Sequence, residues 1–139
     1  MPEKKKIAII VHSGTIDKLL CAFTLASTAA SMDIETHLYF TFWGLTMLKK
    51  GAMDKAELPA TYKQHEEMLK TKLKEMKYPT AYEMLKRMKA TKNVKIYACS
   101  PTMEMFGVTK DSLIPEVDKI AGAAAFLDIA ADADISLLI

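Results

Sequence analysis

The sequence is poor in features that mark several large classes of protein. Its 139 residues include two cysteines, one arginine and five glycines, and the formal net charge is only +2. A small positive charge mixed with acidic residues argues against nucleic acid binding. Two distant cysteines, Cys21 and Cys99, without a targeting signal favour free thiols in a reducing, cytoplasmic setting over a disulfide.

Long apolar runs are also missing. The first run, Ile7 to Val11, is too short for the core of a signal peptide. The tracts IAGAAAFLDIA and ISLLI are separated by aspartates and fall short of the roughly 20 residues that cross a bilayer. We therefore expect no secretion signal and no membrane span. Three scattered histidines without paired spacing predict no metal site, and no cofactor is expected.

The sequence does contain an alternation of strand-like and helix-like segments. Apolar, β-branched runs predict strands at 5–12, 34–43, 94–98, 135–139 and, more weakly, 116–120. Helical spacing or small-residue runs predict helices at 13–33, 44–51, 79–93, 100–107 and 122–134. This order predicts an α/β three-layer sandwich with a mainly parallel sheet of about five strands, in a single domain over 1–139.

Residues 51–79 form an insertion that is longer than an ordinary connection. Apolar residues with helical spacing, surrounded by lysines, occur at Met68, Leu69, Leu73 and Met76. This pattern indicates an amphipathic helix with a solvated basic face. A mobile cover or a partner-docking helix, with adaptable methionines, is the functional alternative. The sequence does not separate these interpretations.

Ligands of an open parallel sheet bind at the carboxyl ends of its strands. Three segments there carry polar or aromatic residues: HSGT at 12–15, TFWGL at 41–45 and CSPT at 99–102. The candidate site residues in and beside them are His12, Ser13, Gly14, Thr41, Phe42, Trp43, Gly44, Cys99, Ser100, Thr102 and Met103. Whether they share one pocket depends on the strand order, which stays open.

Cys99 stands where a predicted strand meets a helix start. Ser100 suits the N-cap, and Pro101 suits the first helical turn. Free N–H groups and the dipole of that turn would lower the pKa of a thiol that points toward them. The alternative is a buried cysteine that fills the corner between strand and helix. Both interpretations remain open at this point.

The residues around Cys99 exclude several familiar cysteine chemistries. A dithiol motif needs a second cysteine at position 102, which is threonine. A phosphatase or rhodanese loop needs an arginine six residues on, but position 105 is methionine and the one arginine is Arg87. A cysteine hydrolase needs a histidine base, for which only His12 is suitably placed.

Three stretches resemble the DsrE/DsrF-like family, and within it the DsrE2-like branch, some members of which carry a peroxiredoxin-like label. They are IAIIVHSGTIDKLLCAF, YFTFWGLTMLKKG and KIYACSPTMEMFGVTKDSLIP. The resemblance implies a DsrE-like fold, flavodoxin-like in general shape. It also implies a sulfur carrier or sulfurtransferase that takes sulfane sulfur or thiosulfate on Cys99 and passes it to a partner thiol. Homo-oligomers and thiol-bearing donor and acceptor proteins are implied as partners, and whether the chain is an enzyme stays open.

Three further features have two interpretations each. By the resemblance, Trp43 with Phe42 and Gly44 forms part of the site wall; the alternative is an aromatic plug of the core.

Met103 and Met105 could line a sulfur pocket with soft side chains or simply pack a short helix. Cys21, on a stripe with Asp17, Thr24 and Thr28, is either an auxiliary thiol or a packing or subunit-contact residue.

Two other functions stay open. A flavin or nucleotide binder would use HSGT as a phosphate-cradling loop, although one glycine is a weak signal for such a loop. A non-catalytic, oligomeric binding or regulatory module would use the lysine-rich insertion and the small-residue helix faces, and it would not need Cys99.

Overall fold

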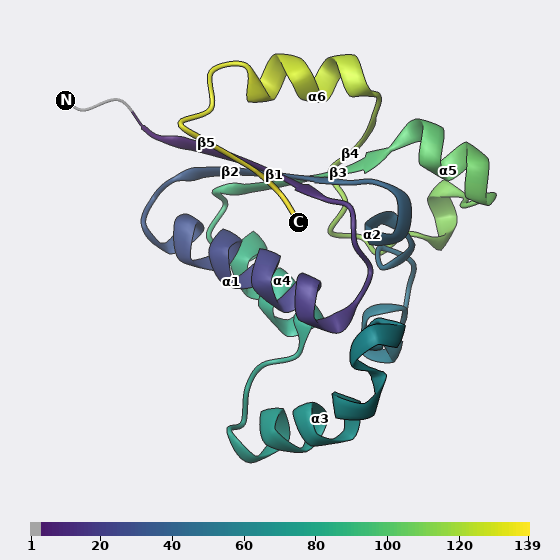
Figure 1. The fold of residues 1–139 in the computed structure, drawn as a ribbon. Helices are drawn as coiled ribbons and strands as arrows, with labels where there is room; N and C mark the ends of the chain where they lie inside the picture. The colour runs from purple at the N-terminus through teal and green to yellow at the C-terminus, as the bar shows by residue number, and fades with distance from the viewer. Residues whose placement is uncertain (1–3) are drawn as a thin grey trace.

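A five-stranded parallel sheet forms the centre of the computed structural model, which describes residues 4–139 (Figure 1). Its strands are β1 (Lys6–Val11), β2 (Glu35–Phe40), β3 (Val94–Cys99), β4 (Lys119–Ala121) and β5 (Ile135–Leu138), in the order β4-β3-β2-β1-β5. Every neighbouring pair is parallel. The predicted α/β fold with a mainly parallel sheet of about five strands is confirmed.

The described residues also form six α-helices. They are α1 (Ile16–Ser31), α2 (Phe42–Thr46), α3 (Glu66–Glu75), α4 (Ala81–Ala90), α5 (Ser100–Phe106) and α6 (Ala123–Ala130). Figure 1 shows α1 and α4 on one face and α6 on the other. The chain crosses the sheet in one direction from β1 to β4 and then returns to β5. Right-handed crossovers therefore place α6 on the opposite face.

The core lies mainly between the sheet and the pair α1 and α4. Alternate strand residues face these helices, and Ile9, Leu38 and Ile96 have no exposed surface. Helix α4 begins with a capping box, in which Thr80 accepts the N–H of Glu83 and the Glu83 side chain accepts the N–H of Thr80. The apolar strand runs are thus explained by burial in a covered parallel sheet.

Several predicted boundaries are wrong in detail. The second strand ends at Phe40 and not at residue 43, because Phe42 adopts a left-handed conformation (φ 49°) and turns the chain into α2. The fourth strand begins at Lys119, later than predicted, because the carboxylate of Asp118 accepts the N–H of Ile96 at 2.7 Å. Helix α6 ends at Ala130, before residue 134.

The insertion contributes to the core and also extends from it. Met53, Ala56 and Leu58 are buried, whereas α3 has no buried residue and Met68 is 66% exposed. In Figure 1, α3 lies beyond α1 and α4, away from the sheet and from α5. The predicted helix therefore forms, and its role in docking stays a prediction. Within residues 4–139, no helix combines the length and apolar character that a bilayer crossing requires.

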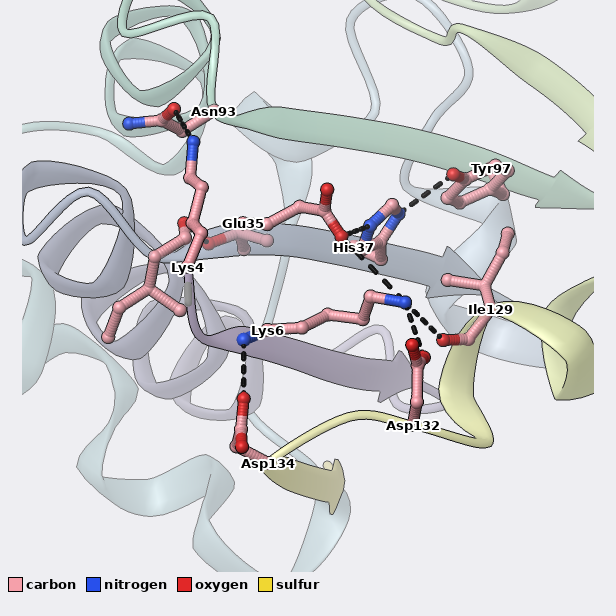
Figure 2. A network of polar contacts seen from close by, with 11 residues as sticks. Lys4, Lys6, Glu35, His37, Asn93, Tyr97, Ile129, Asp132 and Asp134 are labelled. Carbon is pink, nitrogen blue, oxygen red and sulfur yellow. Dashed lines mark hydrogen bonds and ion pairs between the residues drawn. The ribbon is translucent and has the colours of Figure 1, made fainter. Parts of the chain in front are cut away.

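A polar network joins the end of α6 to the N-terminal ends of the strands (Figure 2). The Lys6 ammonium donates to the carbonyl of Ile129 at 3.1 Å and pairs with Asp132, which raises the pKa of Lys6. His37 is 8% exposed and lies between Tyr97 (2.8 Å) and Glu35 (3.0 Å). The contacts of Lys6 hold the end of α6 against the face of the sheet that carries Tyr39 and Tyr97, which pair in register.

Candidate functional site

The three predicted segments lie side by side at the carboxyl edge of the sheet. Strand β2 lies between β1 and β3, so the loops that follow these strands are neighbours. Two backbone hydrogen bonds join the first two loops: Thr41 N–H to Val11 O (3.1 Å) and Gly44 N–H to His12 O (2.9 Å). Helices α2 and α5 lie at this same end in Figure 1. The strand order, which the sequence left open, therefore brings the segments together.

Cys99 ends β3 and is only 6% exposed. The prediction that Ser100 caps the following helix is wrong. Cys99 itself occupies the N-cap with extended backbone (φ −68°, ψ 115°), and Ser100 is the first residue of α5. Ser100 is exposed, and no side-chain hydrogen bond caps this helix. The thiol is therefore held inside the strand-to-helix corner.

Hydroxyl groups surround the Cys99 sulfur. Thr102 Oγ1 donates to Cys99 Sγ at 3.3 Å and lies 3.1 Å from Thr41 Oγ1. The backbone N–H of Phe42 donates to the same Thr102 oxygen at 3.1 Å. The loop after β2 is thus connected to the sulfur through a single threonine.

Tyr39 reaches the same corner from the middle of the sheet. Its ring stacks on Phe126 of α6 with a centroid distance of 4.6 Å. Its hydroxyl donates to Ala121 O at 3.3 Å, and Ala121 pairs with Cys99 across β3 and β4. Because a phenol has one proton, the hydroxyl can serve either this carbonyl or an ionised Cys99 sulfur.

The surroundings of Cys99 lower the pKa of its thiol. Burial alone would raise the pKa of Cys99, but the Thr102 hydroxyl that donates to the sulfur, the nearby hydroxyls of Thr41 and Tyr39, and the Thr102 N–H together lower the pKa below its ordinary value. Burial raises the pKa of Tyr39, and the neighbouring Cys99 raises it further. The two shifts have opposite directions, so the Cys99 thiol loses its proton more readily than an ordinary cysteine and Tyr39 less readily than an ordinary tyrosine. A thiolate of this kind can act as a nucleophile and as a leaving group.

We expect Tyr39→Phe to reduce the reactivity of Cys99 at neutral pH. Loss of a donor to the charged form raises the pKa of Cys99, so the thiolate fraction falls and alkylation near pH 7 slows about tenfold. The measurement is the alkylation rate against pH in a Cys21→Ser background. Tyr97→Phe is the matched control, because Tyr97 pairs with Tyr39 in the sheet but bonds to His37. If the pH profile of alkylation has the same midpoint in Tyr39→Phe and Tyr97→Phe, Tyr39 is not a donor to the Cys99 thiolate.

An aromatic row lines the edge beside Cys99. Phe42 lies between His12 (centroids 5.3 Å apart) and Phe106 (6.3 Å), and Trp43 stacks on Phe106 at 5.1 Å. Trp43 is 60% exposed, so the interpretation as a core plug is wrong. The ring of His12 contacts Phe42, and the structure of residues 4–139 gives it no hydrogen bond to Cys99. The predicted help from a histidine base therefore finds no support in this geometry.

The HSGT loop is occupied by protein contacts. The N–H groups of His12 and Ser13 both donate to the carbonyl of Ile139, at 2.8 and 3.2 Å. Gly14 is required by close packing, since a Cβ there would lie 2.5 Å from Trp43 O. N–H groups already bonded to protein are not free to cradle a phosphate. This arrangement argues against the flavin or nucleotide interpretation.

The remaining predicted residues differ in their positions. Met103 is 7% exposed and packs in the core, whereas Met105 is 58% exposed. Cys21 is exposed on α1. Within the described part of the chain, no three His, Cys, Asp or Glu side chains gather as metal ligands would.

Sequence reasoning missed Tyr39 and Phe106. Period-two alternation along β2 could have placed Tyr39 on one face with residue 41, but its approach to Cys99 depends on the register of β2 and β3.

A family model and two curated proteins are similar to this chain in sequence. The model of the DsrE/DsrF/DrsH-like family matches residues 3–90 and 61–138. The sulfur carrier protein DsrE2 of Allochromatium vinosum is 35% identical, with 99% of each chain covered. The uncharacterized protein YrkE of Bacillus subtilis is 28% identical, over 99% of this chain and 98% of its own.

Two solved structures share the fold at low sequence identity. The ychN protein of E. coli has a TM-score of 0.63 and 16% identity, over 99% of this chain and 100% of its own. The protein MTH1491 of Methanobacterium thermoautotrophicum has a TM-score of 0.60 and 12% identity, over 96% of this chain and 97% of its own.

Proposed function

This chain belongs to the DsrE/DsrF/DrsH-like family, and from that premise we propose that it is a sulfur carrier that uses Cys99. Cys99 would accept sulfane sulfur, or the sulfur of thiosulfate, and pass it to a partner thiol. One observation carries the proposal: a buried thiol at a strand end is surrounded by hydroxyl donors that lower its pKa. The name of the Allochromatium vinosum relative, a sulfur carrier protein, supports the same role.

The chemistry needs one activated thiol and no second cysteine. In loading, the Cys99 thiolate attacks the outer sulfur of a donor persulfide. A new bond forms between Cys99 Sγ and that sulfur, the donor S–S bond breaks, and its electron pair leaves on the donor thiolate. No external oxidant is required. Thr102 in place of a second cysteine fits such a carrier, because a neighbouring thiol would release the sulfur by forming a disulfide.

The test is mass spectrometry of the wild-type protein after incubation with a protein persulfide, thiosulfate or tetrathionate. We expect a reductant-reversible gain of one sulfur atom or of a thiosulfonate group. Trypsin would place this gain on residues 96–110, which contain Cys99, and not on residues 19–49, which contain Cys21. Because the two cysteines fall on different peptides, one digest assigns the site.

Two outcomes would overturn the proposal. One is no gain of mass with any donor, and the other is a gain confined to residues 19–49. The alternative would then be a binding or regulatory module, which uses α3 and does not need Cys99. Thiol-bearing donor and acceptor proteins are part of the sulfur-carrier proposal. Homo-oligomerisation stays a prediction, with exposed Leu127 (64%) and Leu138 (70%) as apolar surface in its favour.

A further inference from the structure

We propose that Thr102 is the positioning residue for sulfur release, because its hydroxyl proton is directed to Cys99 Sγ by donors from Thr41 and Phe42. This inference rests on the proposed carrier function and assigns the group that makes Cys99 a good leaving group. Thr102 would act through the sulfur of Cys99 and would not touch the acceptor.

Proton counting fixes the direction of this hydrogen-bond chain. Thr102 Oγ1 has one proton to donate and two lone pairs that accept. The Phe42 N–H can only donate, so it occupies one lone pair at 3.1 Å. Since the Thr102 proton goes to Cys99 Sγ, the 3.1 Å contact with Thr41 requires Thr41 to be the donor there. The Thr102 hydroxyl thus accepts two hydrogen bonds and donates one, to the sulfur.

The burial of Thr102 and Cys99 maintains this direction of hydrogen bonding. Thr102 has no exposed surface, so its hydroxyl is shielded from competing water, and Cys99 is only 6% exposed. Donors that act in sequence polarise one another, and in a buried site they act on the sulfur more strongly than in water. This chain of hydrogen bonds therefore stabilises negative charge on Cys99 more than it stabilises the neutral thiol.

The backbone of the loop after β2 holds the donors in place. Phe42 has φ 49°, a left-handed conformation that is unfavourable for a bulky residue. Its ring is held between His12 and Phe106, and Gly44 packs directly on Val11. The surrounding contacts thus maintain an unfavourable backbone conformation that points the Phe42 N–H at Thr102.

The stabilised charge appears when sulfur is released. An acceptor thiolate attacks the outer sulfur of the Cys99 persulfide, and a bond forms between these two sulfurs. The bond between the outer sulfur and Cys99 Sγ breaks, its electron pair stays on Sγ, and the outer sulfur keeps its proton. A thiol of lower pKa leaves faster in such exchange. Donors on Sγ therefore favour transfer onward over retention.

The experiment compares Thr102→Val with Thr102→Ser in a Cys21→Ser background. Loaded protein is mixed with N-acetylcysteine, and the loss of the carried sulfur is followed by mass spectrometry. We expect Thr102→Val to transfer about tenfold more slowly and to shift the pH profile of Cys99 alkylation to higher pH. Thr102→Ser keeps the hydroxyl and should retain both properties. Thr41→Val, which removes only one donor into Thr102, should slow transfer about threefold.

Thr36→Val is the matched control for losing a buried threonine hydroxyl. Thr36 has no exposed surface, and its hydroxyl donates to Ile34 O at 2.9 Å at the other end of β2. We expect this variant to transfer sulfur at the wild-type rate and to keep the wild-type pH profile of Cys99 alkylation. The inference is overturned if Thr102→Val and Thr41→Val both match the wild type, or if Thr36→Val slows transfer equally.

Failure of the carrier function gives a different result from failure of this inference. If the unmutated protein takes up no sulfur, the proposed function is wrong. The alkylation profile still decides the role of Thr102, because it needs no sulfur donor. An unchanged midpoint in Thr102→Val, Thr102→Ser and Thr41→Val alike then overturns the role of the hydroxyl chain, and a shift only in the variants that lose a hydroxyl supports it.

Discussion

Cys99→Ser is expected to abolish sulfur loading while the fold is retained. A serine oxygen does not ionise in the accessible pH range and cannot form the S–S bond, so loading should fall more than a hundredfold. Serine is slightly smaller than cysteine and can accept the hydrogen bond that Thr102 donates to Sγ. The melting temperature should therefore change by only a few degrees. Intact mass and thermal unfolding measure the two properties on the same samples.

Cys21→Ser is the control for this result. Cys21 is the other free cysteine and is exposed on α1, so its replacement should leave both loading and stability unchanged. Persistent loading of Cys99→Ser together with loss of loading in Cys21→Ser would show that Cys21 is the carrier and that the site at the strand end has another purpose. Loss of loading in each single variant would indicate a mechanism that needs both thiols.

The fold could be predicted because its strands and helices have strong local signals. Buried parallel strands such as β1 and β3 are continuous apolar runs, and α1 and α4 have helical apolar spacing. The errors lie where local propensity loses to tertiary contacts. Phe42 and Trp43 have the composition of a strand, but the packing of Gly44 on Val11 turns the chain into α2.

The candidate site was predictable only in part. The position of Cys99 at a strand end and the neighbouring loops follow from the general rule for parallel sheets. The hydroxyl chain does not, because the contact between Thr102 and Thr41 joins residues 61 positions apart and depends on β2 lying beside β3. Position 102 illustrates the limit: the sequence makes Thr102 a candidate site residue and excludes a dithiol there, whereas the structure shows that its hydroxyl donates to the sulfur.

Gly44→Ala is expected to cause the largest loss of stability among these variants. A Cβ at Gly44 would lie 2.1 Å from Val11 O and 2.8 Å from Val11 C. Both atoms belong to the backbone of a central strand, so the alanine cannot be accommodated by a side-chain rotation. We expect the free energy of unfolding to fall by about 3 kcal/mol and the melting temperature by roughly 10 °C.

The same substitution should also affect the thiol, because Gly44 lies in the turn that carries Thr41 and Phe42. Displacing this turn separates its donors from Thr102, which raises the pKa of Cys99 and slows alkylation at neutral pH. Gly51→Ala is the control: Gly51 has φ 80°, but a Cβ there would meet nothing within 4 Å, so the substitution should cost only the backbone strain of about 1 kcal/mol. Thermal unfolding and alkylation rates measure both effects. The prediction is contradicted if Gly44→Ala and Gly51→Ala have the same melting temperature and the same alkylation rate. The close approach of Gly44 to Val11 would then not hold the donors near Cys99.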